Sequence, residues 1–169
     1  MRTRLLVILL ALVVTACGDD GDPPARAPTH STTTDIGQTF RAFAAGGDPP
    51  PIAKQVDLYL GNAFTGVVTS TRVTDRKAWA TCTEIGTYAG TSCPISPLTV
   101  LRRHPAVDAV TRPTRPCLAT YGPLPPHLRG LDRTVLVPKH ATCATTFAIQ
   151  LVTDDHGRLV AVSTLLGEP

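Results

Sequence analysis

The chain lacks the sequence features that most enzymes and membrane-spanning proteins carry. Among its 169 residues the longest apolar run is Leu5–Val14, which is shorter than the roughly 20 residues that a transmembrane helix needs. No serine lies in a nucleophile-elbow pattern, and no glycine-rich phosphate-binding loop is present. The formal net charge of +3 is too small to indicate a nucleic-acid-binding protein. These absences predict a non-catalytic protein with no cofactor, no metal and no nucleic-acid partner.

The first sixteen residues have the pattern of a secretory signal peptide. Arg2 and Arg4 form a basic start, and the apolar run that follows has the length of a signal-peptide core. The next residues, Val14-Thr15-Ala16-Cys17, resemble a bacterial lipobox. In lipoproteins of that kind, a diacylglycerol is attached to the cysteine thiol before the signal peptide is removed. The alternative is an ordinary cleaved signal followed by an incidental cysteine.

The lipobox resemblance implies an anchor at Cys17 and a location on the extracytoplasmic face of a bacterial cell membrane. Each buried CH₂ of an acyl chain such as palmitate contributes about 0.8 kcal/mol, so two or three chains hold a protein stably where one would not. Removal of residues 1–16 leaves 14 cationic residues against 13 acidic ones, a net charge of +1. We therefore expect membrane lipid to be one partner of the protein, through Cys17.

The remainder of the chain divides into a polar tether and one domain. Residues 18–34 read GDDGDPPARAPTHSTTT, with no aromatic residue and no apolar periodicity. Such a segment buries too little apolar surface to offset the entropy of ordering it. We predict a lipidated cysteine and disordered tether at residues 17–34, followed by a single α+β domain at residues 35–169.

Two short helices are predicted in the domain. Asp35 followed by Gln38 matches a helix capping box, and the apolar residues after it have helical spacing up to Gly46. Ser96-Pro97 begins a second helix, because proline is favoured at the first helical position.

The strands are predicted from alternation of apolar and polar residues. Residues 56–60 and 133–137 alternate, and residues 64–74 and 77–83 are further β-like runs. Six prolines between residues 105 and 126 predict a long irregular loop. Residues 145–153 and 158–165 flank Asp-Asp-His-Gly and predict a C-terminal β-hairpin.

These elements predict an α+β fold with a mainly antiparallel sheet, one or two short helices, two disulfides and the C-terminal hairpin. An N-terminal helix followed by a sheet that ends in a long hairpin also resembles the nuclear-transport-factor-like fold. That resemblance concerns architecture only, because no signature residue supports it.

Four cysteines remain if Cys17 is lipidated: Cys82, Cys93, Cys117 and Cys143. An exported chain meets oxidising conditions, so two disulfides are expected, in one of three connectivities. We favour Cys82–Cys93, which closes a glycine-containing loop, and Cys117–Cys143, which holds the proline-rich loop. The rival interpretation is a metal site, since His140 and Cys143 have ligand spacing. No CxxC or HxxxH partner accompanies them.

Three further features have both a functional and a purely structural interpretation. Asp154-Asp155-His156 resembles a catalytic cluster, but before Gly157 it is typical of a turn. Seven cations between residues 99 and 140 form either a patch for anionic polymers or lipids, or a solvated face of arginine stems. Trp79 is expected to be a core residue beside Cys82.

The segment Cys117–Pro123 carries a second family resemblance. Its cysteine, tyrosine and proline have the spacing found in the reactive loop of the bacterial subtilisin-inhibitor family, and Ala78–Cys82 resembles the strand that enters that family's first cysteine. The family's disulfides join the first cysteine to the second and the third to the fourth. The resemblance implies an inhibitor of subtilisin-type serine proteases.

On that alignment Ala119 fills the primary specificity pocket of the protease. Thr120 lies across the scissile bond, and Tyr121 completes the inhibitory loop. A loop tethered by a disulfide and stiffened by proline loses little entropy on binding, which suits inhibition. The chain departs from the family in its cysteine spacings, and it lacks the family's His-Pro between the first two cysteines.

Overall fold

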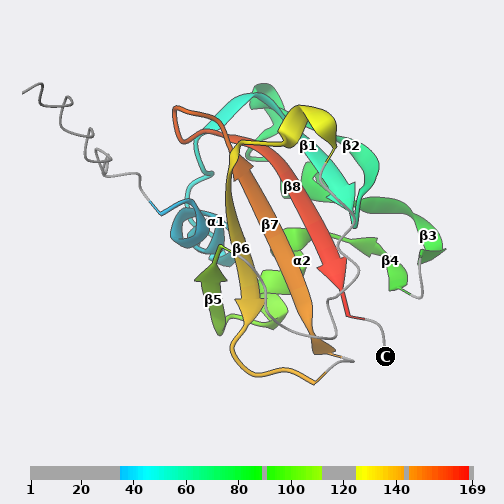
Figure 1. Ribbon diagram of the computed structural model, residues 1–169. Coiled ribbons are helices and arrows are strands. Elements are labelled where there is room, and N and C mark those ends of the chain that lie inside the picture. The colour runs from blue at the N-terminus through cyan, green and yellow to red at the C-terminus, as the bar shows by residue number, and fades with distance from the viewer. Residues whose placement is uncertain (1–34, 89–90, 112–124, 143–144, 168–169) are drawn as a thin grey trace, which may run out of the picture. The chain divides into compact units, whose positions relative to one another are not determined.

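The fold is known from a computed structural model, which describes residues 35–88, 91–111, 125–142 and 145–167 (Figure 1). The helices are α1 (Ile36–Ala45) and α2 (Pro97–Arg103), with 3₁₀ turns η1 (Ser70–Arg72), η2 (Arg76–Trp79) and η4 (Pro126–Leu128). The strands are β1 (Ile52–Leu60), β2 (Ala63–Thr69), β3 (Cys82–Tyr88), β4 (Thr91–Ile95), β5 (Val107–Val110), β6 (Asp132–Pro138), β7 (Phe147–Thr153) and β8 (Leu159–Leu166).

The fold class is α+β, as predicted, with a six-stranded, mostly antiparallel sheet. The strand order is β2-β1-β8-β7-β6-β5, and of these neighbouring pairs only β1–β8 is parallel. β3 and β4 form a separate two-stranded antiparallel sheet. The predicted C-terminal hairpin is confirmed by the pairing of β7 with β8. Figure 1 shows these two strands in the middle of the sheet.

Both predicted helices are present, and their ends have local causes. The Asp35 carboxylate accepts a hydrogen bond from the Gly37 N–H at 3.0 Å and so caps α1. α1 ends at Gly46, whose φ of 122° is unfavourable for any residue with a side chain. Ser96 caps α2 through the Leu98 N–H, and Pro97 begins that helix as expected.

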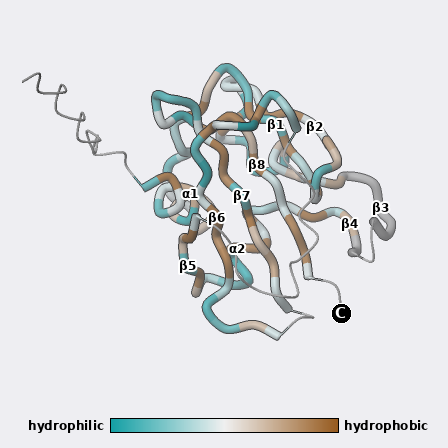
Figure 2. The backbone as a smooth tube through the Cα atoms, in the orientation of Figure 1, coloured by the Kyte–Doolittle hydropathy of each residue, from teal (hydrophilic) through white to brown (hydrophobic). Residues whose placement is uncertain are grey.

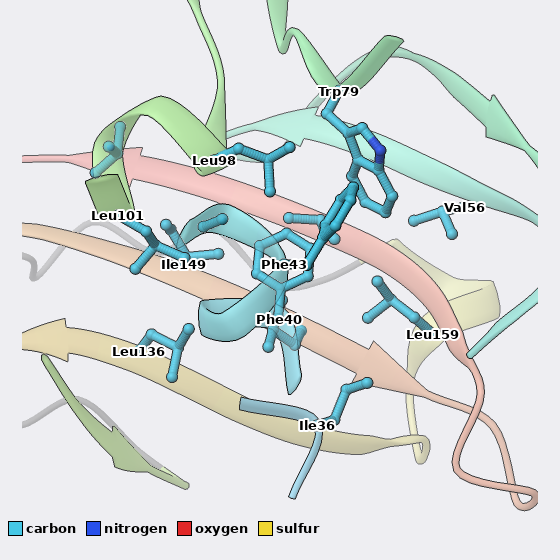
Figure 3. Close-up of a cluster of buried hydrophobic side chains, with 14 of the residues drawn as sticks. Ile36, Phe40, Phe43, Val56, Trp79, Leu98, Leu101, Leu136, Ile149 and Leu159 are labelled. Carbon is cyan, nitrogen blue, oxygen red and sulfur yellow. The ribbon is translucent and has the colours of Figure 1, made fainter. Parts of the chain in front are cut away.

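The main core lies between the helices and one face of the sheet (Figure 3). Trp79 is fully buried, and its ring centroid lies 5.5 Å from that of Phe40 and 5.6 Å from that of Phe43. Leu98 and Leu101 join this cluster from α2. In Figure 2, hydrophobic residues are brown, and many of them lie along the strands of the sheet and the helices that pack on it. Trp79 is therefore a core residue, as expected, and its aromatic neighbours belong to α1.

The opposite face of the sheet is also buried. Tyr59, Val152 and Ala161 form a cluster there with Leu128 of η4. Val135, Val137 and Ala148 form a second cluster on β6 and β7. All seven residues of β7 are buried, which is why its sequence reads as a nearly continuous apolar run.

Three sequence predictions were wrong in detail. Residues 70–72, and residues 77–79 of η2, lie in 3₁₀ turns where strands were expected. The cause at η2 is Asp75, whose carboxylate accepts the Lys77 N–H at 3.0 Å and bends the chain into a turn. Residues 107–110 form the edge strand β5 inside the expected irregular loop. Pairing with β6 there supplies backbone partners that no local pattern reveals.

One disulfide, Cys82–Cys93, is present among the described residues, with an S–S distance of 2.00 Å. It joins β3 to β4, as the favoured pairing predicted. Cys117 and Cys143, the other predicted pair, lie outside the described residues. Within the described part of the chain, no helix has both the length and the apolar character needed to cross a membrane.

Candidate functional site

Most residues predicted to carry function lie outside the described part of the chain. This holds for Cys17 and the tether, and for Cys117, Ala119, Thr120 and Tyr121 of the proposed inhibitory loop. His140 is exposed, but Cys143, its partner in the rival metal site, is likewise outside the described residues. The candidates for a functional site are therefore three separate clusters of polar side chains among the described residues.

The first cluster is the β7–β8 turn. Asp154 accepts hydrogen bonds from the backbone N–H groups of His156 at 3.0 Å and Arg158 at 2.9 Å. Its other oxygen lies 2.8 Å from the Arg158 guanidinium. Gly157 completes the turn with a φ of 72°. Asp154, Asp155 and His156 lie close enough to hold a metal ion. Two backbone N–H groups and the Arg158 guanidinium already bind the Asp154 carboxylate, however, so the turn interpretation is favoured.

The pKa of Asp154 reflects this arrangement. Partial burial alone would raise its pKa, but the hydrogen bonds from Arg158 and His156 outweigh burial, and the pKa is lower than that of an ordinary aspartate. A carboxylate whose pKa is lowered by folding stabilises the fold above its unfolded-state pKa. That stabilisation is lost as the pH falls through the folded-state pKa.

Replacing Asp154 with Asn is expected to lower the free energy of unfolding by about 1–2 kcal/mol at pH 6, because charge-assisted hydrogen bonds are lost. The difference from the wild type should shrink as the pH falls below about 3.9, the ordinary pKa of an aspartate, because the unfolded wild-type chain takes up a proton there before the folded chain does. Urea unfolding at several pH values measures this. Asp155→Asn is the matched control, since the neighbouring Asp155 is more exposed, and its one hydrogen-bond partner among the described residues is the His156 ring. A pH-independent difference would contradict the prediction.

The second cluster joins η4 to the sheet. His127 Nε2 lies 3.5 Å from an Asp57 carboxylate oxygen and 3.4 Å from the Tyr59 hydroxyl. Burial raises the pKa of Tyr59, and the charge of Asp57 raises it further. Tyr59 therefore stays protonated at neutral pH and can serve only as a hydrogen-bonding group. Such a cluster holds η4 on the sheet, and no reactive nucleophile is part of it.

The third cluster lies on the helical side of the domain, and we call it the basic surface: Arg41, Arg76, Lys77 and Arg102. Arg41 comes from α1, Arg76 and Lys77 from η2, and Arg102 from α2. They are brought together because α1, α2 and η2 share one core around Trp79. The four cations line two hollows of about 390 Å³ each, and Arg102 contributes to both.

Neutral groups hold two of these cations in place. The Arg41 guanidinium donates to the Pro105 carbonyl at 3.3 Å. The Arg76 guanidinium donates to the Ala44 carbonyl at 3.3 Å and lies 4.8 Å from the centre of the Phe43 ring. Neutral acceptors and an aromatic face orient a guanidinium but leave its charge uncompensated.

The basic surface also lacks carboxylate partners within the part of the chain that the structure describes. None of its four cations forms an ion pair there, and neither hollow is lined by an acidic residue. Asp75 is adjacent to Arg76 in sequence, but its carboxylate pairs with Arg72 at 2.8 Å. The surface can therefore attract an anion without first breaking an internal salt bridge.

The basic surface differs from the cationic segment that the sequence suggested. Five of the seven cations between residues 99 and 140 are among the described residues, and of these five only Arg102 lines it. Arg133 lies on β6 and donates to Gln150, and Lys139 pairs with Asp108. Sequence reasoning missed Arg41, Arg76 and Lys77, because they are far from Arg102 along the chain and no local pattern joins them.

Compared with known protein families, curated proteins and solved structures, the chain matches none of them. The resemblances to lipoproteins, to subtilisin inhibitors and to the nuclear-transport-factor-like fold therefore stay predictions from the residues themselves.

Proposed function

We propose that the protein is a lipid-anchored, non-catalytic binding module on the extracytoplasmic face of a bacterial cell membrane. The observation that carries the proposal is the order of residues 1–17: a basic start, an apolar run of signal-peptide length, and small residues ending at Cys17. Two or three acyl chains on this cysteine give stable membrane attachment.

The chemistry of the described residues supports a binding role over a catalytic one. The polar clusters have structural partners: Asp154 organises a turn, and His127 bonds to the sheet through Asp57 and Tyr59. The basic surface, by contrast, has cations without carboxylate partners among the described residues. Uncompensated positive charge beside apolar hollows suits recognition of an anion, and it supplies no nucleophile or proton acceptor.

The anchor is tested on the wild-type chain purified from a bacterial membrane. Digestion followed by mass spectrometry is expected to give an N-terminal peptide that begins at Cys17 and carries a diacylglycerol. A peptide that begins elsewhere, or an unmodified Cys17, would show that the protein is not a lipoprotein of this kind.

A second candidate function is inhibition of a subtilisin-type serine protease through Ala119–Thr120. The observation that favours it is the Cys82–Cys93 disulfide, which joins the first two cysteines of the domain as in the inhibitor family that the chain resembles. The pairing of Cys117 with Cys143 and the exposure of the loop remain part of the proposal.

Mixing the purified chain with subtilisin-like proteases tests this second function. Inhibition should be stoichiometric, and Ala119→Asp should weaken it at least a hundredfold, because a carboxylate is costly to bury in an apolar pocket. Leu118→Ala is the matched control in the same loop. Rapid cleavage of the chain without inhibition would exclude this function.

A further inference from the structure

We propose that the basic surface docks the domain onto anionic phospholipid headgroups of the membrane that carries its anchor. The inference rests on the proposed function and deepens it, because it assigns a surface and a ligand chemistry to the anchored module. The ligand is an amphiphile with a negatively charged head, and a phosphatidylglycerol bilayer is the simplest example.

Charge is the first reason for this assignment. Four cations gather within two adjoining hollows that no described carboxylate lines. A cation near an anionic bilayer surface contributes about 1 kcal/mol, which is roughly a fivefold change in binding per cation. Four such cations give an attraction that depends on salt, since it fades beyond a Debye length of about 8 Å at physiological ionic strength.

The apolar lining of the hollows is the second reason. The hollow beside α1 has Ala42, Ala44, Ala45, Leu101 and Pro105 among its lining residues, and Gln38 is its one uncharged polar side chain. The other has Ala80, Pro94, Ile95 and Leu98 among its lining residues. Apolar walls with a cationic rim match the boundary between headgroups and acyl chains, where cationic side chains meet phosphate and apolar groups meet hydrocarbon. A soluble anionic polymer would use the cations and leave the apolar walls without a partner.

The length of chain before α1 is the third reason. From Cys17 to Ile36 there are nineteen peptide steps, so the first residue of α1 stays within about 65 Å of the anchor even if the chain is fully extended. Anchoring therefore supplies a high local concentration of lipid, and a weak surface interaction is enough to dock the domain.

The test uses the chain without its signal peptide and with Cys17→Ser, so that no acyl chain contributes. Sedimentation with large vesicles containing 30% phosphatidylglycerol is compared with sedimentation with pure phosphatidylcholine vesicles. We expect binding at least tenfold stronger to the anionic vesicles at 0.05 M NaCl, and loss of that binding at 0.5 M NaCl. Equal binding to both vesicle types, or no binding to either, would overturn the proposal.

The double variant Lys77→Gln/Arg102→Gln assigns the binding to this surface. Both side chains are exposed, and within the described part of the chain neither one forms a side-chain hydrogen bond or an ion pair. Their replacement should therefore leave the melting temperature unchanged. Binding to the anionic vesicles should fall roughly 25-fold, at about fivefold per cation. Lys54→Gln/Arg129→Gln removes two exposed cations elsewhere and is expected to reduce binding less than threefold.

Two outcomes of this comparison would contradict the assignment. An equal loss in both double variants would mean that net charge binds the vesicles without a defined surface. Binding that appears only after Asp19, Asp20 and Asp22 are replaced by Asn would identify the acidic tether as the occupant of the basic surface. The vesicle assay contains no acylated protein, so a negative result in it would not contradict the proposed anchor at Cys17. Likewise, finding Cys17 unmodified would not change the result expected in the vesicle assay.

Discussion

Cys17→Ser is expected to abolish attachment of the processed chain to the membrane through lipid. A serine hydroxyl cannot accept diacylglycerol in place of the cysteine thiol, and lipoprotein processing depends on that modification. The described part of the chain contains no helix able to span a bilayer. Without two or three acyl chains the protein loses about 0.8 kcal/mol for every CH₂ that was buried. The variant should be released from the membrane, or it should accumulate with residues 1–16 still attached.

Fractionation of cells that express each variant measures this outcome. Membranes are washed with 0.5 M NaCl, so that attraction between the basic surface and anionic lipid does not retain the chain. The wild type and the control Thr15→Ser, which keeps Cys17, should remain in the membrane fraction. A Cys17→Ser chain that is shortened normally and still resists the salt wash would show that the anchor lies elsewhere.

Trp79→Ala is expected to lower the free energy of unfolding by about 3–5 kcal/mol, the range for deleting a large aromatic side chain from a core. Trp79 is fully buried and packs edge-on against both Phe40 and Phe43 (Figure 3). Its indole N–H also donates to the Val73 carbonyl at 2.9 Å. The substitution leaves a cavity between α1 and the sheet, and it removes the partner of that carbonyl.

Urea unfolding followed by far-UV circular dichroism measures the loss, because Trp79 is the only tryptophan and its fluorescence disappears with it. Phe64→Ala is the control, since Phe64 is 60% exposed and its loss should change stability by no more than about 0.5 kcal/mol. Trp79→Phe should show an intermediate loss, because it keeps an aromatic ring and loses the hydrogen bond. A Trp79→Ala loss as small as that of Phe64→Ala would contradict the position of Trp79 at the centre of the core.

The local structure around Trp79 is one feature that the sequence did not predict correctly. Alternation around residue 79 predicted a strand, whereas the structure has the 3₁₀ turn η2. The determining contacts are the cap formed by Asp75 and the long-range packing of Trp79 against α1. A β-like composition cannot distinguish a strand from a buried turn when tertiary contacts supply the burial.

The parallel pairing of β1 with β8 is a second such case. Each strand was predicted at about its observed position, because side-chain alternation and turn residues are local signals. Their adjacency places Leu58 beside Val162, more than a hundred residues later, and no local signal encodes it. The core contacts of both faces of the sheet depend on that pairing.

The sequence by itself determined the features whose physical cause lies within a few residues. These are the capped helices α1 and α2, the β7–β8 hairpin with its Asp-Asp-His-Gly turn, and the signal-like pattern that ends at Cys17. The sequence also lacks the local motifs of common enzymes, and for that reason the proposed role is binding.

Only the tertiary structure decided which charges act together. Arg41, Arg76, Lys77 and Arg102 come from three elements, and one core around Trp79 brings them to a common surface. Side-chain packing between distant segments creates such a surface, so it has no counterpart in any single stretch of the chain.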